Sequence, residues 1–396
     1  MERIYATYAR LLEATDLTFT RYLYKEINWD NRFILIKGQK GVGKTTMLLQ
    51  HIKRTFANAS QALYVSVDDF WFATHTLLEL ADFHYAHGGT HLFLDEIHKY
   101  PGWEQQVKNI YDSYPALHIV VTGSCMLKLE NLQADMSRRA RQYTLLGMSF
   151  REYLMLEGIA EFPVLTLDDI LENHFMRASA IAAKIRVLPH FERYIQMGYY
   201  PFYQEAGDGF NERLQQVVNT ILESEIPAVG DVEYESIRKT RLLLGVLAER
   251  TPFTLNVSNL SSALSLSRNT MLKLFELMEK AALIRRLYAA KMGMGVLVKP
   301  DKILFDNTNI MYALSGAVDA GTMRETCFAS MLASGHTMVM PQQGDFVVDG
   351  DILFEVGGKG KKFTQIKDVP HSYVVADQIE VGMGNKIPLW LFGFLY

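Results

Sequence analysis

A lysine and a threonine follow a closely spaced set of glycines near the start of the chain. The stretch FILIKGQKGVGKTT, residues 33–46, has the spacing G-x-x-x-x-G-K-T from Gly38 to Thr45. Glycines let a loop curl so that its backbone N–H groups face a phosphate without a Cβ in the way. A lysine at this spacing reaches the β- and γ-phosphates, and the hydroxyl after it is a natural ligand of Mg²⁺. The spacing predicts a triphosphate site whose contacts come from Gly38, Gly41, Val42, Gly43, Lys44, Thr45 and Thr46.

The residues on both sides of this loop predict the strand and the helix that would position it. Before the loop, the apolar run from Phe33 to Ile36 is typical of a buried strand. After the loop, apolar residues recur at helical intervals from about Lys44 onward, at Met47, Leu48, Ile52 and Phe56. The positive end of such a helix points at the phosphates, which supports the prediction of a triphosphate site.

A pair of carboxylates follows a second apolar run, HLFLDE at residues 91–96. Asp95, at the end of the predicted strand, can hold Mg²⁺ through water, and Glu96 can orient and polarise an attacking water. A glutamate directly after the aspartate favours a hydrolase over a small-molecule kinase, in which the substrate supplies the nucleophile. Neither Asn-Lys-x-Asp nor an Asp-x-x-Gly after the strand is present, so we expect ATP rather than GTP.

The next apolar run, LHIVV at residues 117–121, ends in Thr122-Gly123-Ser124. In a sheet of this kind, the strand beside the one that carries the two acids brings a polar sensor to the γ-phosphate. Thr122 and Ser124 are both candidates, and we assign Ser124 to the nucleotide contacts. A plain polar turn after a strand is the alternative.

Basic residues follow in SRRAR, residues 137–141. An arginine near the γ-phosphate neutralises transition-state charge, within one chain or from a neighbouring subunit. Arg138 and Arg139 are the candidates, and a solvated basic run is the alternative. The predicted catalytic residues are Lys44, Glu96 and Arg139.

Three histidines, His84, His87 and His91, have a spacing that could suit zinc. No cysteine or acidic ligand falls in register with them. Histidines at the end of a helix also interact favourably with its C-terminus, so a metal site is not our expectation here.

The composition allows two or three domains with sizeable cores, because the chain has 396 residues and 49% apolar content. The formal net charge of −4 does not suggest a polyanion-binding surface over the whole protein. Cys125 and Cys327 lie far apart, which argues against a disulfide scaffold and fits a reducing compartment. No apolar signal segment or membrane span is apparent, since the longest apolar run, at residues 389–396, is strand-sized. We expect a cytoplasmic protein.

Four segments together resemble a large family of prokaryotic AAA+-type ATPases: GQKGVGKTTML, HLFLDEIHKYPGWEQQVKNIYD, IVVTGS and SRRARQYTLLGMSFREYL. In that family a P-loop domain is followed by a winged helix and a C-terminal restriction-endonuclease-like domain. The resemblance covers most of the chain. It implies a parallel sheet with helices on both faces, Thr45 and Asp95 at the Mg²⁺, Glu96 as catalytic acid, and Arg139 at the arginine position of the family.

The expected fold is therefore α/β, and the resemblance together with the helical and strand patterns divides the chain into four parts. These are a P-loop ATPase domain with a parallel sheet at 1–150, a helical lid at 151–235, a winged helix at 236–302 and an endonuclease-like domain at 303–396. A helical lid over a P-loop can couple the nucleotide state to neighbouring molecules.

The winged-helix prediction comes from three helical patterns, at about 237–249, 256–264 and 268–280, and from strands expected at 283–288 and 295–298. Residues 236–302 hold 12 Lys/Arg against 4 Asp/Glu, which gives +8 and leaves −12 for the rest of the chain. This charge fits phosphate contacts on duplex DNA. A packing or protein-contact module is the alternative. The candidate DNA contacts are Arg268, Lys273, Arg285 and Arg286.

In the C-terminal region, Asp345 and Glu355 are the candidates for the Mg²⁺-binding acids of a nuclease-like fold. Such nucleases carry Glu-x-Lys, and here Gly357 stands at the lysine position. The sequence VDGD at residues 348–351 predicts a two-residue hairpin turn. In that register Asp345 lies opposite Phe354 and Glu355 projects from the other face, so we expect no nuclease activity. Binding of nucleic acid or a partner stays open through Lys359, Lys361 and Lys362.

These patterns predict an Mg²⁺-dependent ATPase whose nucleotide state moves the lid and the winged helix. One alternative is a DNA-associated regulator that binds ATP and hydrolyses little of it. A second alternative is an ATP-gated nuclease. An arginine that acts on a neighbouring subunit would require a homo-oligomer.

Overall fold

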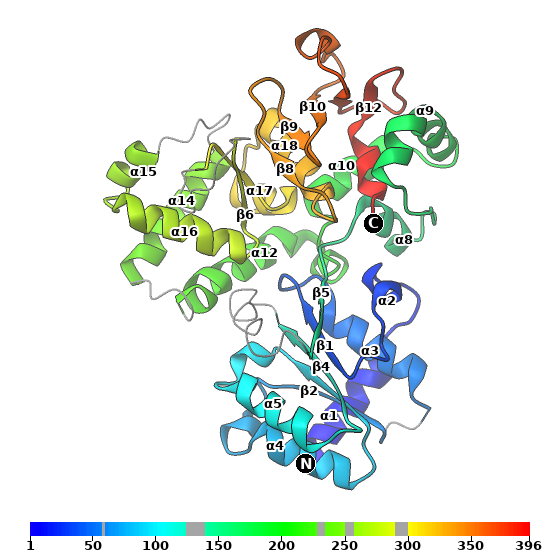
Figure 1. Ribbon diagram of the computed structural model, residues 1–396, viewed down its shortest axis with the longest axis vertical. Coiled ribbons are helices and arrows are strands. Elements are labelled where there is room, and N and C mark those ends of the chain that lie inside the picture. Colours follow the sequence, from blue (N-terminus) through cyan, green and yellow to red (C-terminus); the bar gives the residue numbers. More distant parts are fainter. Residues whose placement is uncertain (58–59, 124–138, 228–233, 250–256, 290–299) are drawn as a thin grey trace. The chain divides into compact units, whose positions relative to one another are not determined.

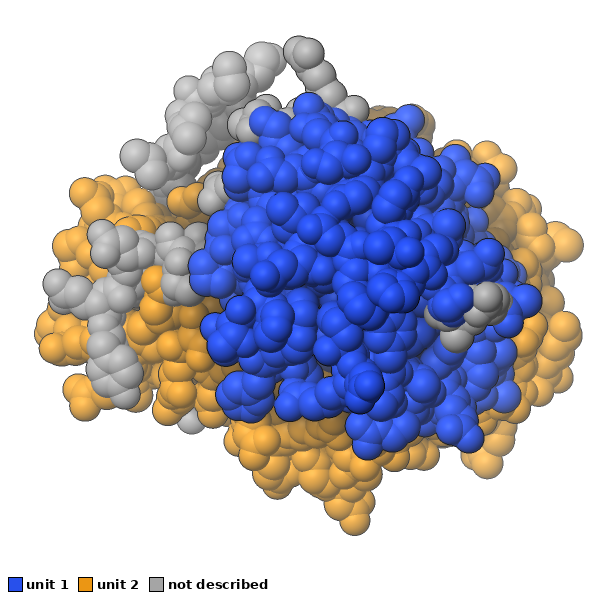
Figure 2. All heavy atoms as spheres, turned by 90° about the horizontal axis from the view of Figure 1, so that it is seen from below, with its two compact units in different colours: residues 1–147 blue, residues 148–396 orange. Residues whose placement is uncertain are grey.

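The computed structural model describes residues 1–57, 60–123, 139–227, 234–249, 257–289 and 300–396. The chain forms two compact units, residues 1–147 (unit 1) and residues 148–396 (unit 2), which Figure 2 shows in blue and orange. Among the described residues, no helix is both long enough and apolar enough to cross a membrane.

Unit 1 is built on a five-stranded sheet in the order β2-β3-β4-β1-β5 (Figure 1). All four strand pairs are parallel, which confirms the expected α/β fold with a parallel sheet. The apolar runs FILI and LFL are buried on both faces of the sheet, as is typical of central parallel strands. The strands are β1 (Phe33–Lys37), β2 (Ala62–Ser66), β3 (His91–Asp95), β4 (His118–Gly123) and β5 (Arg141–Thr144).

Helices cover both faces of this sheet. Figure 1 shows α1 and α3 on one side, and α4 and α5 on the other. Helix α3 begins at Lys44, as its apolar periodicity predicts, and a capping box between Thr76 and Glu79 starts α4. The helices of unit 1 are α1 (Glu2–Ala14), α2 (Leu23–Glu26), α3 (Lys44–Thr55), α4 (Leu77–Ala86) and α5 (Trp103–Ser113), with 3₁₀ turns η1 (Phe70–Ala73) and η2 (Ile97–Lys99).

Unit 2 opens with helices and ends with a mixed sheet. The helical part contains α8 (Phe150–Leu156), α9 (Leu167–Ala182), α10 (Val187–Met197), α11 (Tyr203–Ala206), η4 (Gly207–Gly209), α12 (Phe210–Thr220) and the π-helical turn η5 (Ile221–Glu225). The sheet has the order β12-β11-β10-β9-β8. Strands β10, β11 and β12 are parallel to one another, and β9 is antiparallel to both of its neighbours, β10 and β8. Its strands are β8 (Met338–Val339), β9 (Phe346–Val348), β10 (Ile352–Gly357), β11 (Ser372–Ala376) and β12 (Lys386–Pro388), with a 3₁₀ turn η6 (Phe363–Gln365).

Three helices and a two-stranded sheet occupy the region of the predicted winged helix: α14 (Tyr234–Glu249), α15 (Val257–Ala263), α16 (Arg268–Lys280), β6 (Ile284–Leu287) and β7 (Lys302–Phe305). The strand expected at 295–298 lies outside the described residues. The partner of β6 is β7 instead, so the boundary expected between residues 302 and 303 falls inside a paired strand. Helices α17 (Thr308–Leu314) and α18 (Ala320–Met331) then lead to the C-terminal sheet.

A buried polar network joins the end of α10 to the start of α17. The Asn309 side chain accepts from the amide of Tyr199 at 2.8 Å and donates to the carbonyl of Ile195 at 2.8 Å. The Thr308 hydroxyl donates to the same Ile195 carbonyl at 2.6 Å. Because buried polar groups are costly unless they are paired, this network fixes the two segments against each other within unit 2.

The strand expected at residues 389–396 is wrong. Residues 389–394 form a 3₁₀ helix, η7 (Leu389–Phe394), and all six are buried. An apolar run this short has no periodicity that separates a strand from a buried helical turn. The segment packs closely on α8, since a Cβ on Gly393 would lie 2.6 Å from the Cβ of Phe150.

The two-residue turn expected in the hairpin between β9 and β10 is also wrong. Val348 pairs with Ile352, so the loop holds three residues, 349–351. Asp349 adopts a left-handed conformation, with φ of 50°. Its carboxylate accepts from the amide of Thr337 at 2.9 Å and contacts the His336 ring at 2.6 Å. These side-chain bonds hold the longer loop, and the paired strands shift by one residue relative to the expectation.

Candidate nucleotide site

The loop between β1 and α3 has the backbone that its glycines predict. Gly41 and Gly43 have φ of 89° and 96°, in the left-handed region that side chains disfavour. Gly38 is needed for another reason, since a Cβ there would lie 2.4 Å from the carbonyl oxygen of Leu145. Leu145 follows β5, and its amide donates to the Lys37 carbonyl at 2.8 Å. Leu145, the residue after β5, therefore packs directly against the start of the loop. Val42, within the loop, is fully buried.

Lys44 folds back over the same loop. Its side chain is buried, and its Nζ donates to the carbonyls of Gly38 and Gln39, both at 2.9 Å. The ammonium group is thus held inside the curl of backbone where a phosphate would bind. Thr46 lies exposed on the first turn of α3.

Asp95, at the end of β3, is the shared acceptor of the site and is only 2% exposed. One of its oxygens accepts from the Thr45 hydroxyl at 2.5 Å and from the Tyr64 hydroxyl at 2.8 Å. The other accepts from the amide of Glu96 at 3.1 Å and from the Thr122 hydroxyl. Strands β2, β3 and β4 and helix α3 therefore all direct a polar group at one carboxylate.

The Tyr64 hydroxyl is kept protonated in this network. Burial, followed by the charge of Asp95, raises the pKa of Tyr64 far above its usual value. The group therefore acts as a fixed donor to Asp95 throughout the neutral range. Tyr64 was not among the residues predicted from the sequence.

The donor set fits Mg²⁺. Thr45 and Asp95 offer hard oxygen atoms that lie 2.5 Å apart, at the mouth of the phosphate-binding loop. Mg²⁺ is commonly held by one or two protein oxygens together with substrate phosphates, rather than by a cage of side chains. In keeping with this, the described residues contain no group of three His, Cys, Asp or Glu side chains that would hold a metal alone.

Glu96 directly follows Asp95 and has a left-handed backbone, with φ of 55° and ψ of 36°. Its amide also lies 3.4 Å from the Thr122 hydroxyl. Its carboxylate lies 3.7 Å from Nε2 of His98 and 4.0 Å from Nζ of Lys99. The backbone of Glu96 is thus fixed by Asp95 and Thr122, while its side chain meets the residues of η2.

Two further expectations concern polar groups near the γ-phosphate. Arg139 pairs with Asp112 of α5 at 2.7 Å, and its guanidinium lies 5.7 Å from the centre of the Tyr111 ring. Among its described contacts, none is with Lys44 or Asp95. Ser124 and Arg138 lie outside the described residues. Thr122, the other candidate sensor, is the one that the structure brings to Asp95.

Arg21 is a second residue of this site that sequence reasoning missed. Its side chain is 4% exposed and donates to the carbonyl of Val42 and, at 2.8 Å, to that of Leu146. It thereby ties the phosphate-binding loop to the segment after β5. A lone arginine between aromatic residues gives no pattern that would reveal this role.

The C-terminal acids have separate partners. The amide of Asp345 donates to the Phe354 carbonyl at 2.9 Å, and its carboxylate accepts from the amide of Val356 at 2.7 Å. In the observed register Phe346, and not Asp345, is the residue opposite Phe354, so the expected register that placed Asp345 and Glu355 on opposite faces is wrong. Glu355 instead pairs with Lys361. The side chain of Lys361 also covers Gly357, since a Cβ there would lie 2.8 Å from it.

Of the candidate DNA contacts, two already form ion pairs within unit 2. Arg285 pairs with Asp306 at 2.7 Å, and Arg286 pairs with Glu279 at 2.6 Å. Arg268 and Lys273 are exposed on α16.

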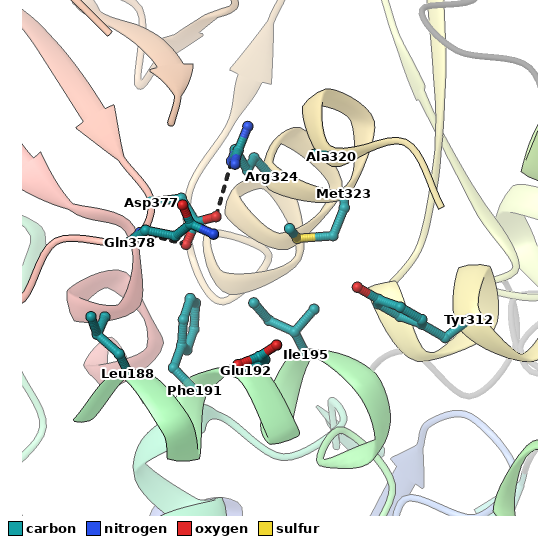
Figure 3. Close-up of a pocket in the computed structure, with 10 residues that line it drawn as sticks. All are labelled: Leu188, Phe191, Glu192, Ile195, Tyr312, Ala320, Met323, Arg324, Asp377 and Gln378. Atoms are coloured by element: carbon teal, nitrogen blue, oxygen red, sulfur yellow. Dashed lines mark hydrogen bonds and ion pairs between the residues drawn. The ribbon is translucent and has the colours of Figure 1, made fainter. Parts of the chain in front are cut away.

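Unit 2 also contains a pocket of about 230 Å³ between α10 and α18 (Figure 3). Its wall on α10 is largely apolar, and the ion pair of Arg324 with Asp377, at 2.9 Å, lies at the opposite side. The lining residues are Leu188, Phe191, Glu192, Ile195, Tyr312, Ala320, Met323, Arg324, Asp377 and Gln378.

Comparison with known proteins yields two family matches and one curated relative. Residues 30–154 match the family model described as "AAA domain", and residues 188–320 match a domain of unknown function, DUF8612. An uncharacterized protein of Methanocaldococcus jannaschii is 27% identical over 318 residues, which cover 77% of this chain and 67% of that protein.

Solved structures similar to the chain include AMPPCP-bound DnaA from Aquifex aeolicus, with 14% identity, 65% of this chain and 84% of that chain covered, and a TM-score of 0.27. NtrX from Brucella abortus in complex with ADP shows 15% identity, coverage of 70% and 72%, and a TM-score of 0.29. TM-scores this low do not establish a shared overall fold. The family match extends from β1 through Asp95 and Glu96 at the end of β3, so residues 30–154 are similar to AAA domains.

Proposed function

We propose that this chain is an Mg²⁺-dependent ATPase that couples its nucleotide state to the helical and winged-helix parts of unit 2. The observation that carries the proposal is the meeting of Thr45 and Asp95 beside the loop that encloses Lys44. This arrangement supports binding of a triphosphate with its metal, and Glu96 follows directly for the chemical step.

Each residue has a defined part in this proposal. Lys44 exchanges its loop carbonyls for the β- and γ-phosphate oxygens. Thr45 and Asp95 hold Mg²⁺, which supplies positive charge to the phosphates when bound. Glu96 orients and polarises the attacking water, and Thr122 keeps the Asp95 carboxylate in place.

Arg139 would act in a homo-oligomer. In the chain itself its guanidinium is engaged by Asp112 and Tyr111. To reach the γ-phosphate of a neighbouring subunit, it exchanges this exposed ion pair for a more highly charged partner. An Arg139→Ala variant is expected to bind ATP normally and to lose turnover only under conditions in which the chain assembles.

Duplex DNA is the partner proposed for the region of α14, α15 and α16. Arg268 and Lys273 are exposed and suit direct phosphate contacts. Arg285 and Arg286 pair with acids, so we expect a smaller loss of DNA affinity from their replacement than from replacement of Arg268. The test is the salt dependence of binding to duplex DNA, which should become shallower in an Arg268→Ala variant.

The central experiment is the steady-state rate of ATP hydrolysis, measured without nucleic acid, with single strands and with duplex DNA. A Glu96→Gln variant should retain ATP binding and lose turnover, because the amide cannot accept a proton from water. Unchanged hydrolysis in this variant would remove Glu96 from the mechanism.

A regulator that binds ATP and turns it over slowly is the second candidate, and the same assay separates the two. Intact Asp95 and Glu96 side by side favour turnover. For the C-terminal domain we propose no nuclease activity, supported by Gly357 at the position where such nucleases carry lysine. Plasmid nicking with Mg²⁺ or Mn²⁺ that disappears in Glu355→Ala would contradict this.

A further inference from the structure

We infer that Lys99 restrains the catalytic action of Glu96: its ammonium group pairs with both Asp68 and Glu96, and its position sets how strongly the charge of the Glu96 carboxylate is neutralised. The inference rests on the ATPase activity proposed above and adds a means of regulating that same site.

The ammonium group of Lys99 forms ion pairs with two carboxylates at different distances. Nζ of Lys99 lies 2.5 Å from Oδ2 of Asp68 and 4.0 Å from Oε2 of Glu96. The side chains of Lys99 and Asp68 are 39% and 45% exposed, whereas that of Glu96 is 18% exposed. Of these two acids, the one closer to Lys99 is the more exposed Asp68, and the more shielded Glu96 lies farther away.

The backbone of Glu96 and Lys99 is fixed by hydrogen bonds, so their side chains can move more readily than their backbone. The amide of Lys99 donates to the carbonyl of Glu96 at 2.9 Å, which closes the single turn of η2. Glu96 itself is held in a left-handed conformation, uncommon for a residue with a Cβ, and its amide bonds to Asp95. Small side-chain movements, rather than backbone movements, therefore change the contact between Lys99 and Glu96.

The charges predict opposite effects for the two partners of Lys99. A carboxylate polarises water through its negative charge, and a nearby ammonium both neutralises that charge and competes for the oxygen atoms. Loss of the ammonium leaves Glu96 freer to act. Loss of the Asp68 charge releases the ammonium toward Glu96 and restrains it. Neither substitution removes the His98 ring, which lies 3.7 Å from Glu96.

Asp68 also connects the site to the surface. It directly precedes Asp69 and the 3₁₀ turn η1, in which Phe70 is 85% exposed. Asp69 caps this turn through the amide of Trp71 and pairs with Arg3 at 2.6 Å. A movement of η1 would therefore shift Asp68, and with it the ammonium that Asp68 shares with Glu96.

The test is steady-state ATP hydrolysis by the full chain, with kcat and KM determined separately. Lys99→Met should raise kcat and Asp68→Asn should lower it, each by about two- to fivefold, the size expected for a partly exposed ion pair. The KM for ATP should stay unchanged, because both substitutions act on the charge next to Glu96 and leave the residues of the phosphate-binding loop in place. The double variant should behave like Lys99→Met, and Lys99→Arg should restore the wild-type rate.

Asp30→Asn serves as the matched control, since it removes an exposed carboxylate elsewhere in unit 1. If Lys99→Met and Asp68→Asn lower kcat alike, or change KM, then Lys99 has a structural role only and the inference is overturned, while the proposed function stands. If Glu96→Gln leaves turnover unchanged, the proposed function itself fails. Absence of turnover in both the wild type and Lys99→Met would overturn both.

Discussion

The hydroxyl of Tyr64, in the middle of β2, lies 2.8 Å from the carboxylate of Asp95 at the end of β3. The two residues stand on adjacent parallel strands, and the tyrosine ring is buried with its donor directed at the proposed metal ligand. The sheet itself therefore orients the acid before any ligand binds. This kind of support is expected around residues that hold metals, because it fixes the direction of their lone pairs.

Replacement of Tyr64 by phenylalanine removes this donor alone. We expect the free energy of unfolding to fall by about 1–2 kcal/mol, because the bond is made to a buried charged acceptor. Urea denaturation measures this change. Tyr85→Phe is the control, since Tyr85 is 41% exposed. A loss of the same size in the control would show that the bond to Asp95 is not the source.

Replacement of Lys44 by alanine removes the ammonium group from the phosphate-binding loop. Hydrogen bonds to charged groups contribute about 1.5–3 kcal/mol, so we expect ATP affinity to fall by roughly ten- to a hundredfold. Titration with a fluorescent ATP analogue measures the affinity, and circular dichroism checks the fold. Lys25→Ala removes an exposed lysine outside the loop and should leave the affinity unchanged.

A methyl group at Gly38 tests the close approach of the residue after β5. The added Cβ would lie 2.4 Å from the Leu145 carbonyl oxygen, and backbone has to shift to admit it. We expect Gly38→Ala to cost about 1–3 kcal/mol of stability. Gly245→Ala, on α14 with open space around its Cβ, should instead stabilise by up to about 1 kcal/mol. Equal effects of the two variants on the unfolding midpoint would contradict this account.

Stability should depend on pH through the buried His51 and the half-buried His91. Burial lowers the pKa of His51 and of His91 to about 4, and neighbouring histidines add to the shift. In the unfolded chain both titrate near 6.5, so the unfolded state binds more protons as the pH falls. The stabilisation is fully present above about pH 6.5 and is lost progressively toward about pH 4, at up to about 1.4 kcal/mol per pH unit for each histidine.

Urea denaturation at pH 7.0 and pH 5.5 measures this loss, above the range in which most carboxylates titrate. His91→Gln should reduce the slope, whereas His87→Gln, at an exposed position of unit 1, should not. Equal stability of the wild type at the two pH values would show that these histidines are not the source of the dependence.

What could be predicted from the sequence was local in the chain. The phosphate-binding loop, the start of α3 at Lys44 and the acid at the end of β3 each depend on a few neighbouring residues with restricted conformations. The parallel sheet was implied by the resemblance to AAA+-type ATPases, which these motifs carry. These features are specified by spacing, and spacing is visible in a sequence.

What could not be predicted depends on residues distant in the chain or on packing. Tyr64 and Arg21 lie in ordinary apolar and aromatic stretches, and their partners are 31 and 21 residues away. The turn before β10 gained a residue because Asp349 binds Thr337, which no turn motif announces. Lys361 reaches Glu355 from four residues beyond Gly357, where the motif would place its lysine.

The polar network between the end of α10 and the start of α17 has a consequence for folding during translation. The Ile195 carbonyl and the Tyr199 amide leave the ribosome more than a hundred residues ahead of Thr308 and Asn309, from which they are separated by 113 and 110 positions. Until those partners emerge, the Ile195 carbonyl and the Tyr199 amide form hydrogen bonds with water instead. Unit 2 can therefore reach its final packing only after α17 has been synthesised.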